Sequence, residues 1–197
     1  MDNHSKQLWK NNAPPWSPSK VLEIGRQLIR AVERCHMSLV YKDNAYGFVH
    51  CDIKPDNIVF DSEPTGELWL IDFSLWTGWR DQSTLNYENR KYKHMGTNEW
   101  ASRRVHNKYV ASGACDIESI CYVLLQLACG RVSFWFQENE EKGLSWAKVH
   151  KQMNAFWKNM HNIPEISYLM PFFDAVNRLR FDSDIDYKAL LSLLSTR

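Results

Sequence analysis

Residues 116–128, "DIESICYVLLQLA", limit the possible folds of this chain more than any other stretch. After the first turn, a helix of this sequence carries apolar side chains on nearly every side. A helix that is apolar all round belongs in the middle of a domain, because each of its faces needs a packing partner. The chain has 197 residues and is 44% hydrophobic, which suits one compact domain built around this helix.

An amphipathic helix is predicted over residues 18–37, where apolar side chains recur at steps of three and four from Val21 to Cys35. Ser17 suits its N-cap, and Pro18 suits the first helical position, where no backbone N–H is needed. Similar patterns predict three more helices in the C-terminal part, at about residues 145–160, 165–178 and 186–195. The fold class is therefore mainly α.

Two short apolar runs, residues 58–60 and 68–71, flank the turn-forming sequence "DSEPTGE" and predict one small β-hairpin. The opening sequence "MDNHSKQLWKNNAPPWSP" is polar and contains three prolines, so residues 1–17 are expected to form an extended arm. The predicted organisation is this arm followed by a single domain over residues 18–197.

Tryptophan is frequent, with nine residues in the chain. Trp69, Trp100 and Trp135 lie inside apolar runs and are predicted to be core or near-core residues. Trp9 and Trp16 lie in the polar arm and leave two interpretations open. They either anchor a partner protein or fold back over the exposed top of the domain.

Charge and cysteine content exclude several classes of function. The 24 basic and 23 acidic residues give a net charge of +1, so no global field favours nucleic acid or a membrane surface. No segment suits a signal peptide, and no apolar run is long enough for a bilayer. Five cysteines without a C-x-x-C pair indicate reduced, mostly buried thiols. We therefore expect a cytoplasmic or nuclear protein without a nucleic-acid or membrane partner.

Two motifs around the predicted hairpin carry chemistry: "HCDIKPDN" before it and "IDFS" after it. The first supplies a carboxylate at Asp52, an amine at Lys54 and an amide at Asn57. The second supplies another carboxylate at Asp72. Phosphoryl transfer needs an oriented hydroxyl and cations on the phosphates. An Asp/Asn pair brought together across a hairpin is a suitable oxygen-donor site for Mg²⁺, which binds through few protein ligands plus phosphate.

These motifs resemble the catalytic loop and the metal-binding motif of the protein kinases. Three further stretches, in the same order along the chain, resemble the casein kinase 1 and vaccinia-related kinase group. They are "MGTNEWASRRVHN", "CDIESICYVLLQLACGRVSFW" and "RLRFDSDIDYKALLSLL". The resemblance covers about residues 18–195 and implies the fold of a kinase C-terminal lobe.

The resemblance implies a role for each candidate catalytic residue. Asp52 would orient the substrate hydroxyl or accept its proton, and Lys54 would contact the transferred phosphate. Asn57 and Asp72 would hold Mg²⁺ and, through it, ATP. These cofactors are expected only if the protein is active, and an inactive protein would need none.

Four more positions match structural residues of the kinases. Asp116 matches the aspartate that braces the catalytic loop from the central helix, and Thr97 matches a threonine that contacts the catalytic aspartate and lysine. His50 and Phe73 resemble members of the hydrophobic stack that joins the two kinase lobes. We expect that end of the stack to be exposed here, and a protein partner or self-association to cover it.

The sequence also departs from the kinase pattern. It contains no G-x-G anywhere, and only 17 residues precede the first predicted helix, so the expectation is a C-terminal lobe without the ATP-clamping N-terminal lobe. A gene-model truncation remains an alternative. Cys51 replaces the arginine that pairs with a phosphorylated activation loop, and Ser74 replaces the glycine of D-F-G. The Cys51 thiol is either a spectator or a reactive group near a lysine.

A long polar segment, residues 74–95, is predicted to be a functional or mobile loop. Basic residues gather in and after it, and they either face acidic substrates or form an ordinary solvated face: Arg90, Lys91, Lys93, Arg103, Arg104 and Lys108.

Three classes of function stay open. The first is a pseudokinase-like binding module that acts on a kinase or a kinase substrate. The second is an active Ser/Thr kinase whose upper lobe comes from a partner chain, and the third is a stand-alone kinase with an unusual nucleotide site. The missing clamp favours the first, and the complete set of catalytic residues favours the second.

Overall fold

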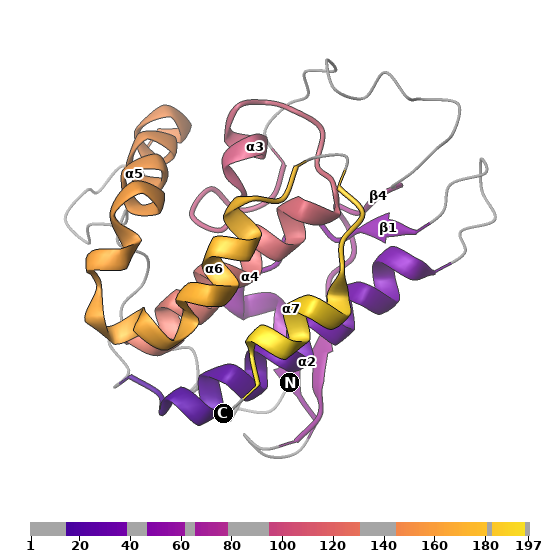
Figure 1. Ribbon diagram of the computed structural model, residues 1–197. Coiled ribbons are helices and arrows are strands. Elements are labelled where there is room, and N and C mark those ends of the chain that lie inside the picture. The colour runs from indigo at the N-terminus through magenta and orange to yellow at the C-terminus, as the bar shows by residue number, and fades with distance from the viewer. Residues whose placement is uncertain are drawn as a thin grey trace.

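The central helix of the fold is α4, Gly113–Cys129, and all of its residues except Ala114 are buried. This computed structural model describes residues 15–38, 47–61, 66–78, 95–130, 145–180 and 183–195. Helix α2, Pro18–Met37, packs alongside α4, and α6, Met170–Asn177, also packs on α4 (Figure 1). Helix α7, Tyr187–Leu193, packs on α2 and α6. The prediction of a buried central helix is therefore confirmed.

The other helices lie close to their predicted positions. A short helix, α3, was not predicted, because its four residues are too few to show a periodic pattern. The C-terminal helices are shorter than predicted, since turns of 3₁₀-helix take up part of their length. The bounds are α3 Arg103–His106, α5 Trp146–Asn159, 3₁₀ turns Met160–Asn162 and Pro164–Leu169, α6 Met170–Asn177 and α7 Tyr187–Leu193.

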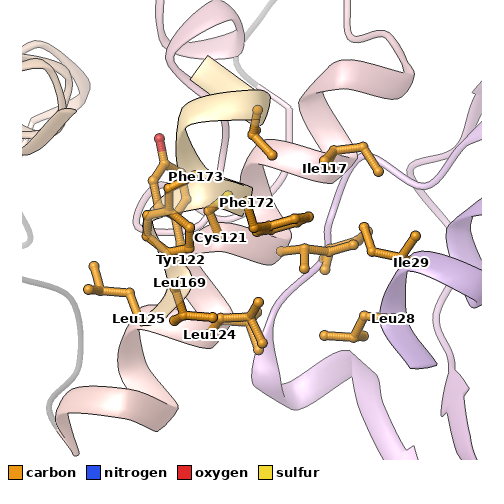
Figure 2. Close-up of a cluster of buried hydrophobic side chains, with 14 of the residues drawn as sticks. Leu28, Ile29, Ile117, Cys121, Tyr122, Leu124, Leu125, Leu169, Phe172 and Phe173 are labelled. Carbon is orange, nitrogen blue, oxygen red and sulfur yellow. The ribbon is translucent and has the colours of Figure 1, made fainter. Parts of the chain in front are cut away.

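The core lies between α2, α4 and α6. Leu28 and Ile29 of α2 and Phe172 and Phe173 of α6 are fully buried, and Figure 2 shows them gathered in one cluster with side chains of α4. Gly25 allows the close approach of α2, because a Cβ there would lie 3.1 Å from a methyl group of Leu124. The fold class is thus mainly α, as predicted.

The described residues form two small antiparallel sheets, of which one was predicted. β2, Ile58–Phe60, pairs with β3, Leu68–Leu70, in the expected hairpin. β1, Phe48–Val49, pairs with β4, Thr77–Gly78. The second pair could not be predicted from sequence, because each strand has two residues and the partners are far apart in the chain.

The tryptophan predictions had mixed outcomes. Trp100 is buried, as predicted, whereas Trp69 is 51% exposed and the prediction for it was wrong. In the run Leu68–Leu70 every side chain is apolar, so the sequence did not indicate which face of the hairpin is covered. Trp9 and Trp135 lie outside the described residues.

Trp16 folds back onto the domain, although not over the catalytic end. The Trp16 side chain packs against the core. The backbone N–H of Trp16 donates to the Leu127 carbonyl at 2.9 Å, near the C-terminal end of α4. Of the predicted arm, residues 1–14 lie outside the described residues, so its extended form stays a prediction. Among the helices that are described, none has the length and apolar character needed to cross a bilayer.

Candidate active site

The loop that precedes the hairpin is tied to the central helix by Asp116. The Asp116 carboxylate accepts the backbone N–H of His50 at 2.7 Å and that of Cys51 at 3.0 Å. Cys51 has a left-handed backbone, with φ of 70°, which turns the chain towards Asp52. On its other side the carboxylate contacts Nε2 of His36 at 3.0 Å. One buried carboxylate therefore fixes the backbone of this loop against α2 and α4.

His50 connects the two chemical motifs. Its Nδ1 accepts the N–H of Asp52 at 3.3 Å, so the ring proton lies on Nε2, which donates to the Ile71 carbonyl at 3.1 Å. The ring is fully buried. The position of Asp72, the next residue in the chain, is thereby linked to the position of Asp52.

Asp52 lies at the centre of the site and is only 7% exposed. Its Oδ1 accepts both the N–H and the hydroxyl of Thr97, at 2.9 and 2.8 Å. Its Oδ2 lies 2.9 Å from Nζ of Lys54, which also donates to the Thr97 hydroxyl at 2.7 Å. The Asn57 amide donates to the Asp52 carbonyl and to Oδ2, at 2.8 and 3.1 Å. The structure therefore brings Asp52, Lys54, Asn57 and Thr97 together.

Asp72 reaches the same region from the other side of the hairpin. The N–H of Ile71 donates to the Asn57 carbonyl at 3.0 Å, and Asp72 follows with a left-handed backbone, φ 61°. Its side chain is exposed, and hydrogen bonds from Ser74 lower the pKa of the Asp72 carboxyl below its usual value. The N–H of Ser74 lies 3.3 Å from Oδ1 of Asp72. Ser74 itself does not have positive φ, so the glycine it replaces is not needed here.

The donor set fits Mg²⁺ carried by a phosphate. The Asn57 side-chain nitrogen donates to Asp52, so Oδ1 of Asn57 is the atom left for a cation. The ionised Asp72 carboxylate supplies a second oxygen. Two hard oxygens suit Mg²⁺ when phosphate and water complete its shell. Within the described part of the chain, no group of three or more His, Cys, Asp or Glu residues forms a metal site of its own.

Gly96 lets residues 96–104, here called the Thr97 segment, approach the loop that carries Asp52. It has φ of 81°, and a Cβ at this position would lie 2.5 Å from the Cys51 carbonyl oxygen. A side chain here would push Thr97 away from Asp52. The "MGT" sequence thus has a packing reason for its glycine.

The half-buried Cys51 has the properties of a spectator thiol. Burial raises the pKa of the Cys51 thiol far above its usual value, and the nearby carboxylate of Asp116 adds to this rise. Because the thiolate is the reactive form, the structure favours the spectator interpretation. The other four cysteines are buried and all five thiols are free, as predicted.

The two arginines of the Thr97 segment, Arg103 and Arg104, make contacts within the domain. Arg103 donates to the Glu118 carboxylate through its N–H at 2.8 Å and Nε at 3.0 Å, and its guanidinium lies 4.4 Å from the Trp157 ring centre. Arg104 donates to the Val110 carbonyl at 2.9 Å. Neither open interpretation, a substrate-facing surface or a solvated face, describes these two arginines. Lys108 is exposed, and Arg90, Lys91 and Lys93 lie outside the described residues.

Phe73 belongs to a group of apolar side chains beside the site, here called the apolar patch: the half-buried Phe48 and the exposed Phe73, Leu75 and Trp76. Phe73, Leu75 and Trp76 are 38%, 37% and 46% exposed. The Phe48 ring lies 5.6 Å from Phe73 and 5.9 Å from Trp76. His50 was expected to share this exposed face, but it is fully buried beneath Phe73, with ring centres 4.7 Å apart. The expectation was therefore wrong for His50.

Sequence reasoning missed several residues that hold the site. His36 contacts Asp116, and its Nδ1 lies 2.6 Å from the Tyr187 hydroxyl, so α2, α4 and α7 meet at one buried cluster. Glu118 accepts from Arg103 and from the Tyr122 hydroxyl. Glu118 did carry a signal, because an acid inside an otherwise apolar helix needs a buried partner.

Comparison with known proteins agrees with these features. The protein kinase domain model matches residues 1–191. A casein kinase 1-like protein of Oryza sativa subsp. japonica is 28% identical over 198 residues, which cover 94% of this chain and 26% of the relative. A probable casein kinase I homolog of Encephalitozoon cuniculi is 28% identical over 199 residues, which cover 99% of this chain and 62% of the relative. The chain therefore spans less than two thirds of either relative.

Proposed function

Because the chain belongs to the protein kinase family and to its casein kinase 1 group, we propose that it acts as a serine/threonine kinase-like binding module. In this role it docks onto a kinase or a kinase substrate and regulates it. The observation that carries the proposal is the apolar patch, three residues of which are more than a third exposed directly beside Asp72. Large apolar side chains gathered in this way on a protein surface usually mark a contact site.

The partner proposed for the patch is a protein surface of matching apolar character, including a second copy of this chain. Phe73, Leu75 and Trp76 follow directly after Asp72 in the chain, so a partner seated on the patch would lie beside the candidate active site. The 197 residues contain no G-x-G-x-x-G sequence to cover a nucleotide, which is a further reason to favour binding over self-sufficient catalysis.

An active kinase is the second candidate, and the arrangement around Asp52 favours it. Lys54, Thr97 and Asn57 already hold the Asp52 carboxylate by direct contacts of 2.8 to 3.1 Å. In this role Asn57 and Asp72 would hold Mg²⁺, which would neutralise charge on the phosphates of ATP. Asp52 would orient the substrate hydroxyl, and Lys54 would contact the transferred phosphate. The upper lobe, or another nucleotide clamp, would come from a partner chain.

The apolar patch should bind an apolar dye. Replacing Leu75 and Trp76 together by serine is expected to lower bis-ANS fluorescence at least twofold, because two of the three most exposed side chains of the patch are removed. Trp69→Ser is the matched control, since Trp69 is equally exposed but lies on β3. A monodisperse monomer in sedimentation, with dye binding equal in both variants, would contradict the proposal.

Mg-ATP binding separates the two candidates. For the binding module we expect calorimetry to detect no Mg-ATP binding tighter than about 1 mM, because the described site offers two metal ligands and no clamp. Micromolar binding that disappears in Asp72→Asn would instead favour the active kinase. Asp72 is the better position for this test than Asp52. Its side chain is exposed, whereas the buried Asp52 carboxylate has four donors and its substitution would disturb folding.

A further inference from the structure

A groove runs along the outer side of α2, between this helix and the start of β3. It has a volume of about 270 Å³ and is bordered by Glu23, Gln27, Arg30, Arg34, Glu67 and Leu68. We propose that this α2 groove binds an acidic segment of a partner polypeptide, with carboxylates of that segment on Arg30 and Arg34. The proposal is independent of the apolar patch and of the candidate active site.

In the half of the groove near the start of α2, the polar side chains are paired within the chain. Gln27 accepts the N–H of Leu68 at 2.8 Å and donates to the Glu23 carboxylate at 3.2 Å. Glu23 also pairs with Arg26. The polar groups of this half therefore already have partners, and they fix the distance between α2 and β3.

The other half presents two exposed arginines, of which Arg30 has, among the described residues, only an electrostatic attraction to Glu23. Arg30 and Arg34 are both exposed, and neither makes a hydrogen bond or ion pair with another described residue. Residues four apart lie on the same face of a helix, so the two guanidinium groups project side by side. Guanidinium groups bind carboxylates through two parallel hydrogen bonds, which makes an acidic ligand the best match.

The length of the groove favours a peptide over a single ion. From Glu23 to Arg34 the helix rises by roughly 16 Å at 1.5 Å per residue. This is about the length of five residues of extended chain. The buried Leu68 and the half-buried Ala31 give the floor an apolar part, on which the aliphatic portion of glutamate side chains can pack.

The groove lies at the far end of the hairpin from the catalytic residues. In the β2–β3 register, Phe60 pairs with Leu68 beside the groove, whereas Ile58 pairs with Leu70 at the end that leads to Asn57. A bound peptide would thus leave both Asp52 and the apolar patch uncovered. The groove would hold a partner protein at one place while another part of that partner reaches the candidate active site.

Fluorescence anisotropy with a defined probe tests the proposal. The probe is a fluorescein-labelled peptide of six glutamates, titrated with the 197-residue protein at about 0.15 M NaCl, where distant charges are screened. Arg30→Glu/Arg34→Glu is expected to weaken binding at least tenfold, because two attractive contacts become repulsive. The control is Lys151→Glu/Lys158→Glu, which makes the same change of net charge at exposed positions of α5 and should alter the affinity less than twofold.

A second pair of variants tests whether removing a negative charge from the groove strengthens peptide binding. Glu67 borders the groove, and its carboxylate competes with the peptide, so Glu67→Gln is expected to tighten binding about threefold. Glu165→Gln removes an exposed carboxylate elsewhere and should change binding less than twofold. No binding by the unaltered protein at millimolar peptide would overturn the proposal. Equal effects of the groove variants and their controls would also overturn it, because they would show attraction by net charge alone.

Discussion

Replacing Asp116 with alanine is expected to lower the free energy of unfolding by about 4 kcal/mol, one of the two largest effects predicted for this protein. Asp116 is 1% exposed, and its carboxylate accepts three donors: the N–H groups of His50 and Cys51, and Nε2 of His36. Alanine would leave all three without a partner, and each unpaired buried donor costs about 1–3 kcal/mol. Water can relieve only part of this cost, because His36, Asp116 and Tyr187 are buried where α2, α4 and α7 meet.

Urea unfolding followed by circular dichroism measures the effect, since the midpoint shifts with stability while the slope stays constant. Asp174→Ala is the matched control. Asp174 lies at the surface and pairs with His161 at 3.2 Å, and such surface pairs contribute about 0–1 kcal/mol. Asp116→Asn should fall between the two, because the amide keeps one acceptor but turns an N–H₂ group towards a donor. A loss no larger than that of Asp174→Ala would contradict the assigned role of Asp116.

The fold could be predicted where a pattern is long and has one explanation. Helix α4 was found because its apolar side chains point in all directions, and α2 because its apolar side chains recur on one face. The β1–β4 pair could not be found, since two-residue strands carry no pattern and Phe48 meets Gly78 only in the folded chain. The exposed position of Trp69 depends on which face of the hairpin α2 covers, and this is a tertiary contact.

In the candidate site, too, local sequence motifs could be recognised, but contacts between distant residues could not be predicted. The motif "HCDIKPDN" placed Asp52, Lys54 and Asn57 in one loop, and the structure brings them together. The contacts that position this loop come from distant elements, as His36 and Tyr187 illustrate. Nothing near either residue in the sequence indicates its partner. Their catalytic roles, like those of the other site residues, stay predictions until binding and activity are measured.

Gly96→Ala is expected to lower the free energy of unfolding by about 3 kcal/mol, although it adds a single methyl group. Part of this loss, about 1–2 kcal/mol, comes from placing a Cβ on a backbone with φ of 81°. The rest comes from the overlap with the Cys51 carbonyl oxygen at 2.5 Å, which requires the two segments to separate. Their separation would stretch the two hydrogen bonds from Thr97 to Asp52, each of which contributes about 1 kcal/mol.

Gly130→Ala distinguishes the two contributions. Gly130 also has a left-handed backbone, φ 67°, but it ends α4 and does not face the catalytic loop, so about 1 kcal/mol is expected from the backbone alone. Amide hydrogen exchange gives the local readout, because the Thr97 N–H is protected by Asp52 in the unaltered protein. Exchange at Thr97 should accelerate in Gly96→Ala and stay unchanged in Gly130→Ala. Equal stability losses with a protected Thr97 would mean that the Thr97 segment tolerates a side chain, and that Asp52 is held by the hairpin without it.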